Sequence, residues 1–210
     1  TSRLNLLKKN KVNLVNGDAR NSDDLRRVLE LCSPFKIVHL ASIASAVDAR
    51  HNPGLMFDLQ LVSLRNILEL MRSKSFNNIE QIMLLSSSTV YGDFEEDVVN
   101  ESVRPKPIGI YANTKYMAER LVRTYANQYG LGTVIIRPSA LYGERCVSRR
   151  VSQMFIENAL LKKPLLLEGG GDGRLDFTYI NDLIDGMVRA LALTNGPEQT
   201  HTFNITFGNS

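Results

Sequence analysis

The sequence predicts an α/β fold in which a doubly wound parallel sheet is covered by helices on both faces. Short runs of β-branched and apolar residues alternate with longer stretches of helical periodicity along most of the chain. Strands that are separated by helices pair in parallel through right-handed crossovers. With 43% hydrophobic and 22% charged residues, the 210-residue chain can bury a core and suits a soluble protein.

Local patterns place each element of this fold. The expected strands are 11–15, 36–40, 81–86, 133–137 and 202–206, and the expected helices are 23–31, 54–72, 111–129, 149–161 and 181–193. Asp23 and Asp24 stabilise the start of the first of these helices, and Gly130 is a typical helix stop after Tyr129. Because ligands bind at the carboxyl ends of parallel strands, the residues that follow each strand are the first candidates for a site.

Composition narrows the class of protein. The net charge is +3 and the basic residues occur as separated pairs, so we expect no nucleic-acid partner. No apolar run approaches the roughly 18 residues of a membrane span, and the first residues do not form a signal peptide. We therefore expect no membrane partner. Cys32 and Cys146 lie far apart without metal-ligand spacing, which predicts reduced cysteines, no metal site and a cytoplasmic location.

A serine, a tyrosine and a lysine carry the chemical signal. Ser87 follows the expected strand 81–86, and Tyr111 and Lys115 are four residues apart in the expected helix 111–129. Residues at this spacing share a helix face, so the Lys115 ammonium is expected to lower the pKa of Tyr111 from about 10. A Tyr base with a Ser hydroxyl alongside suits removal of a proton from a substrate alcohol as hydride leaves the same carbon, which indicates nicotinamide chemistry. An ordinary amphipathic helix pair is the alternative interpretation of Tyr111 and Lys115.

Two features of a dinucleotide-binding sheet are missing from the sequence. No Gly-x-Gly-x-x-Gly motif follows a first strand, and the glycine-rich run 169–173 comes late and opens no helix, so we expect a turn there. A first strand, helix and second strand should precede Lys11, and one βαβ unit takes roughly 30 residues or more. We therefore expect the chain to be part of a longer protein.

Six short motifs, in their order and spacing, resemble those of the extended short-chain dehydrogenase/reductases, specifically the NAD-dependent epimerase/dehydratase family that acts on nucleotide sugars. The matching pieces are Asn16-Gly17-Asp18, His39-Leu40-Ala41-Ser42, Ser86-Ser87-Ser88-Thr89-Val90-Tyr91-Gly92, Tyr111-x-x-x-Lys115, Arg137-Pro138 with Tyr142-Gly143, and Asp176-Phe177-Thr178-Tyr179-Ile180 with Asp182. The resemblance implies a Rossmann-like NAD-binding portion at 1–144 without its first βαβ unit, a small interleaved substrate-binding segment at 145–175, and a return to the core at 176–210. It also implies a homodimer that packs helices 54–72 and 111–129 against their mates.

The resemblance assigns a role to each matching residue. Ser87 is implied to hydrogen-bond the reacting sugar hydroxyl, Tyr111 to be the base, and Lys115 to hold the nicotinamide ribose. The residues implied to bind NAD are Asp18, Ala19, Leu40, Ala41, Ser42, Tyr111, Lys115 and Pro138. The residues assigned to the substrate are Ser87, Ser88, Tyr111, Arg145 and Arg150. A simple turn at 16–18 and a solvated helix start at 145–150 are the alternative interpretations of those two segments.

The two positions after Ser87 distinguish reaction types within the family. Sugar 4,6-dehydratases carry Asp-Glu there, whereas this chain has Ser88 and Thr89. Neither side chain titrates near pH 7, so neither can be the acid or base of water elimination. The resemblance therefore favours NAD-dependent epimerisation of a nucleoside-diphosphate sugar, at C4 through a transient 4-keto intermediate, with a UDP-hexose or UDP-uronic acid as substrate. A dehydratase, reductase or decarboxylase of the same family, and a non-catalytic nucleotide-sugar or dinucleotide binding module, are the alternatives.

Several positions depart from the family pattern. Ala140 stands where an Asn often holds the substrate phosphate, Leu175 stands where an Arg usually precedes Asp-Phe, and Gln60 replaces a helical Asn. Substrate anchoring is therefore expected to differ, and Arg145 and Arg150 are candidates for a diphosphate because an Arg fork suits that group.

Overall fold

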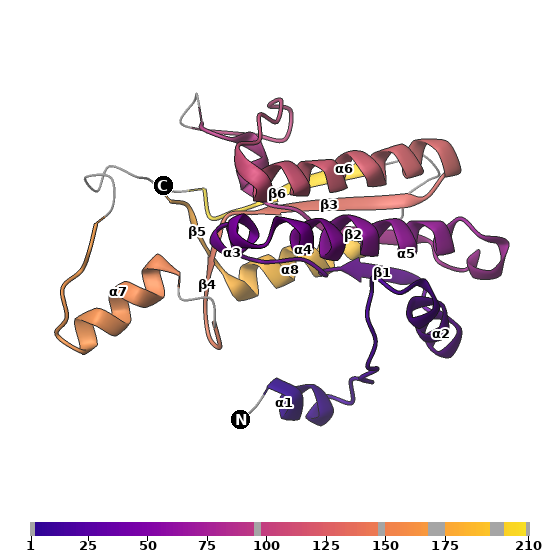
Figure 1. Ribbon diagram of the computed structural model, residues 1–210, viewed down its shortest axis with the longest axis horizontal. Coiled ribbons are helices and arrows are strands. Elements are labelled where there is room, and N and C mark those ends of the chain that lie inside the picture. Colours follow the sequence, from indigo (N-terminus) through magenta and orange to yellow (C-terminus); the bar gives the residue numbers. More distant parts are fainter. Residues whose placement is uncertain (1–2, 95–97, 147–149, 168–174, 194–199, 209–210) are drawn as a thin grey trace.

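The computed structural model describes residues 3–94, 98–146, 150–167, 175–193 and 200–208, which form an α/β protein built around parallel strands (Figure 1). The main sheet has the order β1-β2-β3-β6 and all its pairs are parallel. Its strands are β1 (Lys36–His39), β2 (Gln81–Leu85), β3 (Gly132–Pro138) and β6 (Thr200–Ile205). A second, two-stranded parallel sheet consists of β4 (Ala140–Tyr142) and β5 (Phe177–Tyr179). The predicted fold class is confirmed.

Helices cover both faces of the main sheet, with α2, α5 and α6 on one face and α8 on the other. The helices of the described residues are α1 (Arg3–Lys9), α2 (Ser22–Cys32), α3 (Ala46–His51), α4 (Pro53–Phe57), α5 (Ser63–Met71), α6 (Gly109–Tyr129), α7 (Val151–Leu160) and α8 (Ile180–Leu191). Shorter turns of helix are the π-helix η1 (Asp58–Val62) and the 3-10 helices η2 (Lys74–Phe76) and η3 (Ser88–Tyr91). None of the helices within the described residues is both long and apolar enough to cross a membrane.

The alternation of side chains along the central strands divides the core into two layers. Ile82 and Leu84 of β2 pack in one cluster with residues of α2, α5 and α6. Met83 of β2 and Val134 of β3 point to the opposite face, where they pack in a second cluster with α8. Every residue of β3 is buried, as expected for a strand with neighbours on both sides and helices on both faces.

The expected helix 54–72 is a continuous helical run with a π-helical turn at its centre. The run passes from α4 through η1 into α5. Gln60 lies in the π-helical turn with its side chain fully buried, and neither polar atom of its amide has a partner among the described residues. A π-helical turn inside an α-helix is often found near a functional site.

The expected strand 11–15 is wrong. Residues 12–18 form no regular element, and Val12, Leu14 and Val15 are 37–47% exposed. A strand needs a neighbour for its backbone N–H and C=O groups, and in a sheet of order 3-2-1-4-5-6 the third strand pairs with the second. No described strand of this chain takes that place, so the segment crosses the surface to α2.

Further elements were not expected, among them α1, α3 and the paired strands β4 and β5. The two short strands form because residues 140–142 and 177–179 meet in space, which their separation in sequence conceals. No residue of α7 is fully buried, and Figure 1 shows this helix apart from the main sheet. The division into segments at 145 and 175 stays a prediction, and the glycine run 169–173 lies outside the described residues.

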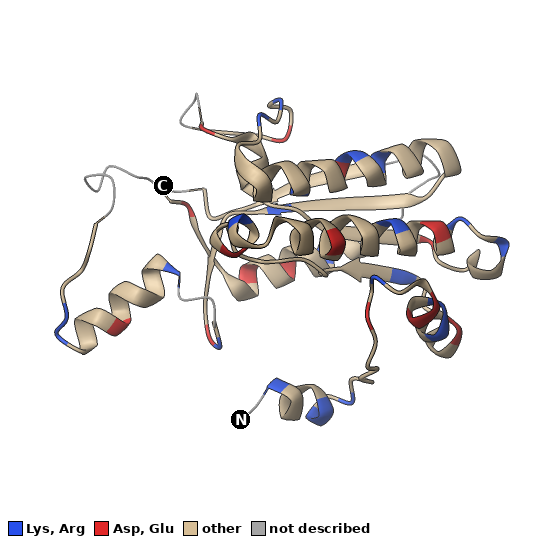
Figure 2. Ribbon diagram, viewed as in Figure 1, with Lys and Arg blue, Asp and Glu red and all other residues tan. Residues whose placement is uncertain are grey.

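Charges are distributed over the whole molecule. Figure 2 shows Lys and Arg on the same helices as Asp and Glu, for example on α2 and α6. Some charges three or four residues apart form ion pairs, such as Arg72 with Glu69 and Arg189 with Asp185. Exposed pairs of this kind contribute little to stability.

Candidate functional site

The ends of the central strands meet at one edge of the main sheet. In the strand register His39 pairs with Leu84, and Leu85 pairs with Ile136. Ser86, directly after β2, donates its backbone N–H to the Ile136 carbonyl at 2.7 Å, which extends the β2-β3 contact by one residue. This edge is the carboxyl edge, where doubly wound sheets bind ligands.

Ser87 begins the 3-10 turn η3 at this edge. It is 8% exposed, and its Oγ accepts the Thr89 backbone N–H at 3.2 Å, which caps the turn. The Thr89 hydroxyl also donates to Ser87 Oγ, at 3.0 Å. Gly92 ends the turn with φ +75°, where a Cβ atom would lie 2.2 Å from the Lys106 carbonyl oxygen, so only glycine fits here.

Tyr111 and Lys115 lie on the first turns of α6 and face the end of β2. The Lys115 Nζ is 5.8 Å from the centroid of the Tyr111 ring and donates to the Leu85 carbonyl at 3.0 Å. Lys115 is 5% exposed, and burial lowers its pKa from the ordinary 10.5 to about 8. Ser87 lies close enough to Tyr111 for its side chain to favour the ionised form of the phenol. The structure therefore brings the three predicted residues together.

The expectation that the pKa of Tyr111 is lowered is wrong for this structure. Burial raises the pKa of the phenol, because a phenolate loses hydration in an apolar environment. The hydrogen bond with Ser87 and the positive charge of Arg150 act in the opposite direction without overcoming burial. Lys115 faces the ring, and its ammonium is directed to a backbone carbonyl.

His39 is buried in the strand and hydrogen-bonded, as expected for a packed histidine. Its Nε2 lies 2.9 Å from Ser63 Oγ on α5. Burial and the nearby charge of Lys115 lower the pKa of His39 from 6.5 to about 4. The imidazole is therefore neutral at pH 7.

A buried ion pair between Arg137 and Glu119 contacts Ser86, the residue before Ser87. Arg137, at the end of β3, donates to both carboxylate oxygens of Glu119 at 2.9 and 2.6 Å, and the two side chains are 3% and 0% exposed. Ser86 donates its hydroxyl to the same carboxylate at 2.5 Å. Arg137 also donates to the Tyr91 hydroxyl at 2.7 Å, and Tyr91 donates to Asn204 of β6 at 2.8 Å. This network ties α6, the helix of Tyr111, to the ends of β2, β3 and β6.

The residues expected to contact the cofactor lie in three places. Asp18 is half-exposed and paired with Arg20 at 2.6 Å, and hydrogen bonds with Arg20 lower its pKa to about 2. Asn66 of α5 donates to the Arg20 carbonyl at 2.8 Å and so fixes this turn, including Ala19, against the helix.

The other cofactor candidates follow β1 and β3. Leu40 is 56% exposed, Ala41 and Ser42 are partly buried, and Pro138 is fully covered as the last residue of β3. Ser42 donates its hydroxyl to the Ile43 carbonyl. These positions belong to the same carboxyl edge as Ser87, whereas Asp18 lies in the turn before α2.

The substrate candidates separate into near and distant residues. Arg150 begins α7 and is close enough for its charge to act on Tyr111. Ser88 is the first residue of η3 and is partly buried. Arg145 is exposed, has φ +64°, and lies 3.6 Å from the Glu144 carboxylate. The structure therefore supports proximity to Tyr111 for Arg150 and does not bring Arg145 to the same place.

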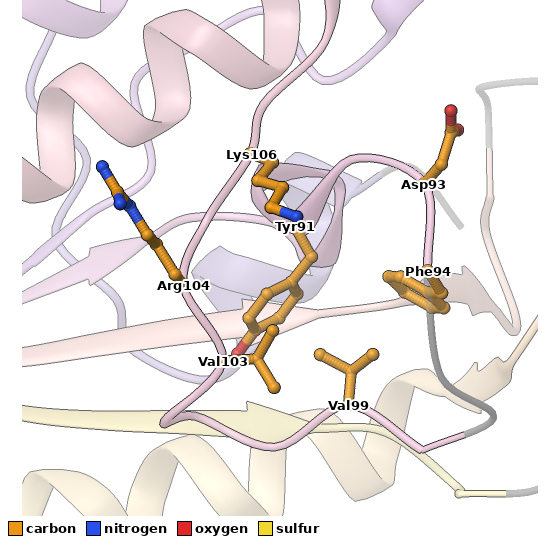
Figure 3. Close-up of a pocket in the computed structure, with 7 residues that line it drawn as sticks. All are labelled: Tyr91, Asp93, Phe94, Val99, Val103, Arg104 and Lys106. Atoms are coloured by element: carbon orange, nitrogen blue, oxygen red, sulfur yellow. The ribbon is translucent and has the colours of Figure 1, made fainter.

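A small cavity lies beside the site, under the segment between Gly92 and α6. It has a volume of about 60 Å³ and is lined by Tyr91, Asp93, Phe94, Val99, Val103, Arg104 and Lys106 (Figure 3). The Phe94 ring meets the Tyr91 ring edge to face, with centroids 6.3 Å apart. The described residues of this segment form no helix or strand. Within the described residues no group of His, Cys, Asp and Glu could hold a metal ion.

Two residues of the site were missed in the sequence, Glu119 and Thr89. Glu119 is four residues after Lys115, and an acidic residue on the buried face of a core helix is a signal that a charged partner exists. Thr89 stands out in the sequence only as a position that lacks an acid, and nothing local in the sequence indicates that its hydroxyl contacts Ser87.

Comparisons with known proteins agree with this geometry. Residues 1–206 match the model of a family described as the NAD dependent epimerase/dehydratase family. A UDP-glucuronate 4-epimerase from Thermodesulfobacterium geofontis is 32% identical over 194 residues, which are 90% of this chain and 58% of that protein. UDP-glucuronate 4-epimerase 2 from Arabidopsis thaliana is also 32% identical, over 90% of this chain and 44% of its own length. The chain thus spans about half the length of the curated relatives it matches.

Solved structures show the same architecture. The UDP-glucuronic acid 4-epimerase of Bacillus cereus, in complex with UDP-glucuronic acid and NAD, has a TM-score of 0.83 at 26% identity over 95% of this chain and 63% of that chain. A UDP-glucose 4-epimerase of Thermus thermophilus, in complex with NAD, has a TM-score of 0.81 at 26% identity over 92% of this chain and 63% of its own. With its strand-end Ser87, its Tyr-x-x-x-Lys helix and a family match along nearly its whole length, the chain belongs to the NAD dependent epimerase/dehydratase family.

Proposed function

We propose that the protein catalyses NAD-dependent epimerisation of a nucleoside-diphosphate sugar, at C4 and through a transient 4-keto intermediate. The observation that carries the proposal is the meeting of Ser87, Tyr111 and Lys115 at the carboxyl edge of the sheet, with no carboxylate at position 88 or 89. Membership in the family supports the general chemistry, and the choice of epimerisation is the proposal.

The residues at the edge fit a nicotinamide cofactor. Lys115 is nearly covered and carries one hydrogen bond among the described residues, to the Leu85 carbonyl. An ammonium has three N–H donors, so two remain for hydroxyl groups such as those of a ribose. Asp18, Ala19, Leu40, Ala41, Ser42 and Pro138 are proposed to line the rest of the cofactor, and Asp18 would have to exchange its pairing with Arg20 for this contact.

Each side chain of the cluster has a distinct task. Bound NAD supplies a reversible hydride acceptor. Tyr111 takes the proton of the substrate hydroxyl, and Arg150 assists because its positive charge favours the phenolate. Ser87 hydrogen-bonds the reacting oxygen of the sugar. The keto sugar turns, and the hydride returns to its other face while Tyr111 gives back the proton, so C4 is inverted and both the protein and the cofactor are left as they started.

Epimerisation is favoured over dehydration by the residues that surround Ser87. Loss of water from the sugar needs an acid and a base near C5 and C6, and the hydroxyls of Ser88 and Thr89 cannot fill these roles at pH 7. Thr89 is instead engaged with Ser87 Oγ. A reductase would consume the reduced cofactor, whereas an epimerase regenerates it in each cycle.

A UDP-uronic acid or UDP-hexose is the proposed substrate. Curated relatives at 32% identity carry the name UDP-glucuronate 4-epimerase, which favours the uronic acid. Arg150, close to Tyr111, is proposed to meet an anionic group of this substrate, since a guanidinium fork matches a carboxylate or a phosphate. Ser88 and Arg145 remain candidates for the substrate, and a cytoplasmic homodimer remains the proposed state of the protein.

The test is turnover of a panel of UDP-, GDP- and TDP-sugars by the natural-length protein, with the sugar ring followed by NMR. We expect inversion at C4 of a UDP-sugar without net consumption of NAD. The Tyr111→Phe variant should lose turnover by at least about 100-fold, the low end of what general acid-base catalysis contributes, and should still bind NAD. Tyr129→Phe, at the exposed end of the same helix, is the matched control and should retain full activity. Activity in Tyr111→Phe at the parent level would contradict the assignment of the base.

A further inference from the structure

Two donors of one residue point at the oxygen of Ser87. The Thr89 backbone N–H is 3.2 Å from Ser87 Oγ, and the Thr89 hydroxyl donates to the same atom at 3.0 Å. A serine hydroxyl offers two acceptor lone pairs and one O–H donor. Thr89 therefore occupies both acceptor positions of the Ser87 oxygen. Only the O–H of Ser87 remains, and it can act as a hydrogen-bond donor.

The remaining O–H of Ser87 is the group that can act on the phenol of Tyr111. The Ser87 side chain lies close enough to Tyr111 to favour the ionised form of the phenol. Because both acceptor positions of Ser87 Oγ are taken by Thr89, Ser87 can act toward Tyr111 only as a donor. A hydroxyl that accepts from one group becomes a stronger donor to the next, because hydrogen bonds in a chain polarise each other.

The neighbouring Ser86 has a different hydrogen-bond partner. Ser86 gives its hydroxyl proton to the buried Glu119 carboxylate at 2.5 Å. Ser87 is thus the only hydroxyl in the run 86–88 that the described hydrogen bonds connect to Thr89. The backbone donor of Thr89 is common to any residue at position 89, but its hydroxyl donor exists only in Thr or Ser.

We propose that Thr89 is a positioning residue that fixes the direction of the hydrogen bond at Ser87, so that Ser87 acts only as a donor and the substrate proton passes directly to Tyr111. This inference rests on the proposed function for its catalytic meaning. The reacting hydroxyl of the sugar transfers its proton to the Tyr111 oxygen. Ser87 stays protonated and donates hydrogen bonds through its O–H to the Tyr111 oxygen and the reacting sugar oxygen. A relay in which Ser87 accepts the sugar proton is excluded while both Thr89 donors occupy its oxygen.

The first measurement follows the ionisation of Tyr111 directly and needs no turnover. Difference titrations at the phenolate absorption band, taken against Tyr111→Phe in the same background, isolate this residue. We expect Thr89→Val and Thr89→Ala, which lack the hydroxyl, to titrate at a higher pH than the parent, and Thr89→Ser to restore the parent midpoint. Thr124→Val is the matched control, because the Thr124 hydroxyl bonds its own helix at the Arg120 carbonyl and is exposed.

The second measurement uses the proposed reaction. Thr89→Val should lower kcat about tenfold with KM nearly unchanged, as expected when one hydrogen bond that aids the transition state is lost. The acid limb of its kcat/KM profile should move to higher pH, and Thr89→Ser should recover both values. Ser87→Ala should retain a residual, Tyr111-dependent rate, because Ser87 is not on the path of the proton.

The outcomes separate this inference from the proposed function. An unchanged Tyr111 midpoint in Thr89→Val and Thr89→Ala, or a shift that Thr89→Ser does not reverse, would overturn the role of Thr89 whatever the substrate is. A shift of equal size in Thr124→Val would also overturn it. Failure of the parent to convert any nucleotide sugar would refute the proposed reaction, and the titration would still decide the role of Thr89.

Discussion

Replacing Lys115 with methionine is expected to make the protein more stable and unable to turn over substrate. Lys115 is 5% exposed and has no carboxylate partner among the described residues. Its pKa falls from 10.5 to about 8 because burial penalises the charged form. At pH 7 the buried ammonium therefore lowers the free energy of unfolding relative to an uncharged side chain at the same position.

The size of this cost follows from the shift in pKa. A fall from 10.5 to about 8 corresponds to about 3 kcal/mol at pH 7, as an upper estimate. Methionine also loses the hydrogen bond to the Leu85 carbonyl, which contributes about 1 kcal/mol. The Lys115→Met variant is thus expected to gain about 2 kcal/mol in the free energy of unfolding at pH 7.

The pH dependence gives the sharper test. Between pH 8 and 10.5 the unfolded chain binds the Lys115 proton and the folded protein has released it, so the stability of the parent rises with pH. The free-energy penalty for the buried Lys115 charge falls to about 1 kcal/mol at pH 10. It then equals the contribution of the lost hydrogen bond, about 1 kcal/mol, so the stability advantage of Lys115→Met should vanish at this pH. Other titrating groups are common to both proteins and cancel in the difference.

The assay is urea unfolding of NAD-free, natural-length parent and variant between pH 7 and 10. Removing the cofactor is necessary because any ligand of the folded state adds to its apparent stability. Lys74→Met, an exposed lysine in η2, is the control and should change stability by less than about 0.5 kcal/mol at every pH. A variant that is less stable than the parent at pH 7, or a difference that does not change with pH, would refute the reasoning.

Two further predictions concern packing and assembly. Arg137→Met should lower the free energy of unfolding by about 3–5 kcal/mol, because it leaves the buried Glu119 carboxylate without its partner, and Glu119→Leu combined with Arg137→Met should recover much of that loss. Urea unfolding of the single and double variants checks this, and purely additive losses would show that the pair is not coupled. Light scattering should find a homodimer of the natural-length protein through the faces of helices 54–72 and 111–129, and a monomer at all concentrations would contradict that assembly.

Local patterns in the sequence determined the layered architecture and indicated the residues proposed to react. The alternation in β2 and β3 and the helical periodicity of α6 are properties of neighbouring residues, so they can be recognised without knowing what packs against them. The spacing of Tyr111 and Lys115 on one helix, with Ser87 at the end of a strand, belongs to the same class of information.

The tertiary structure alone decided how these residues behave. Whether Tyr111 ionises easily depends on burial, on Ser87 and on Arg150, which come from three separate parts of the chain. The strand expected at 11–15 failed to form because a strand depends on a neighbour and not on its own residues. The contact of Arg137 with Glu119 likewise joins distant segments, and charge and burial acquire their energies only when such segments meet.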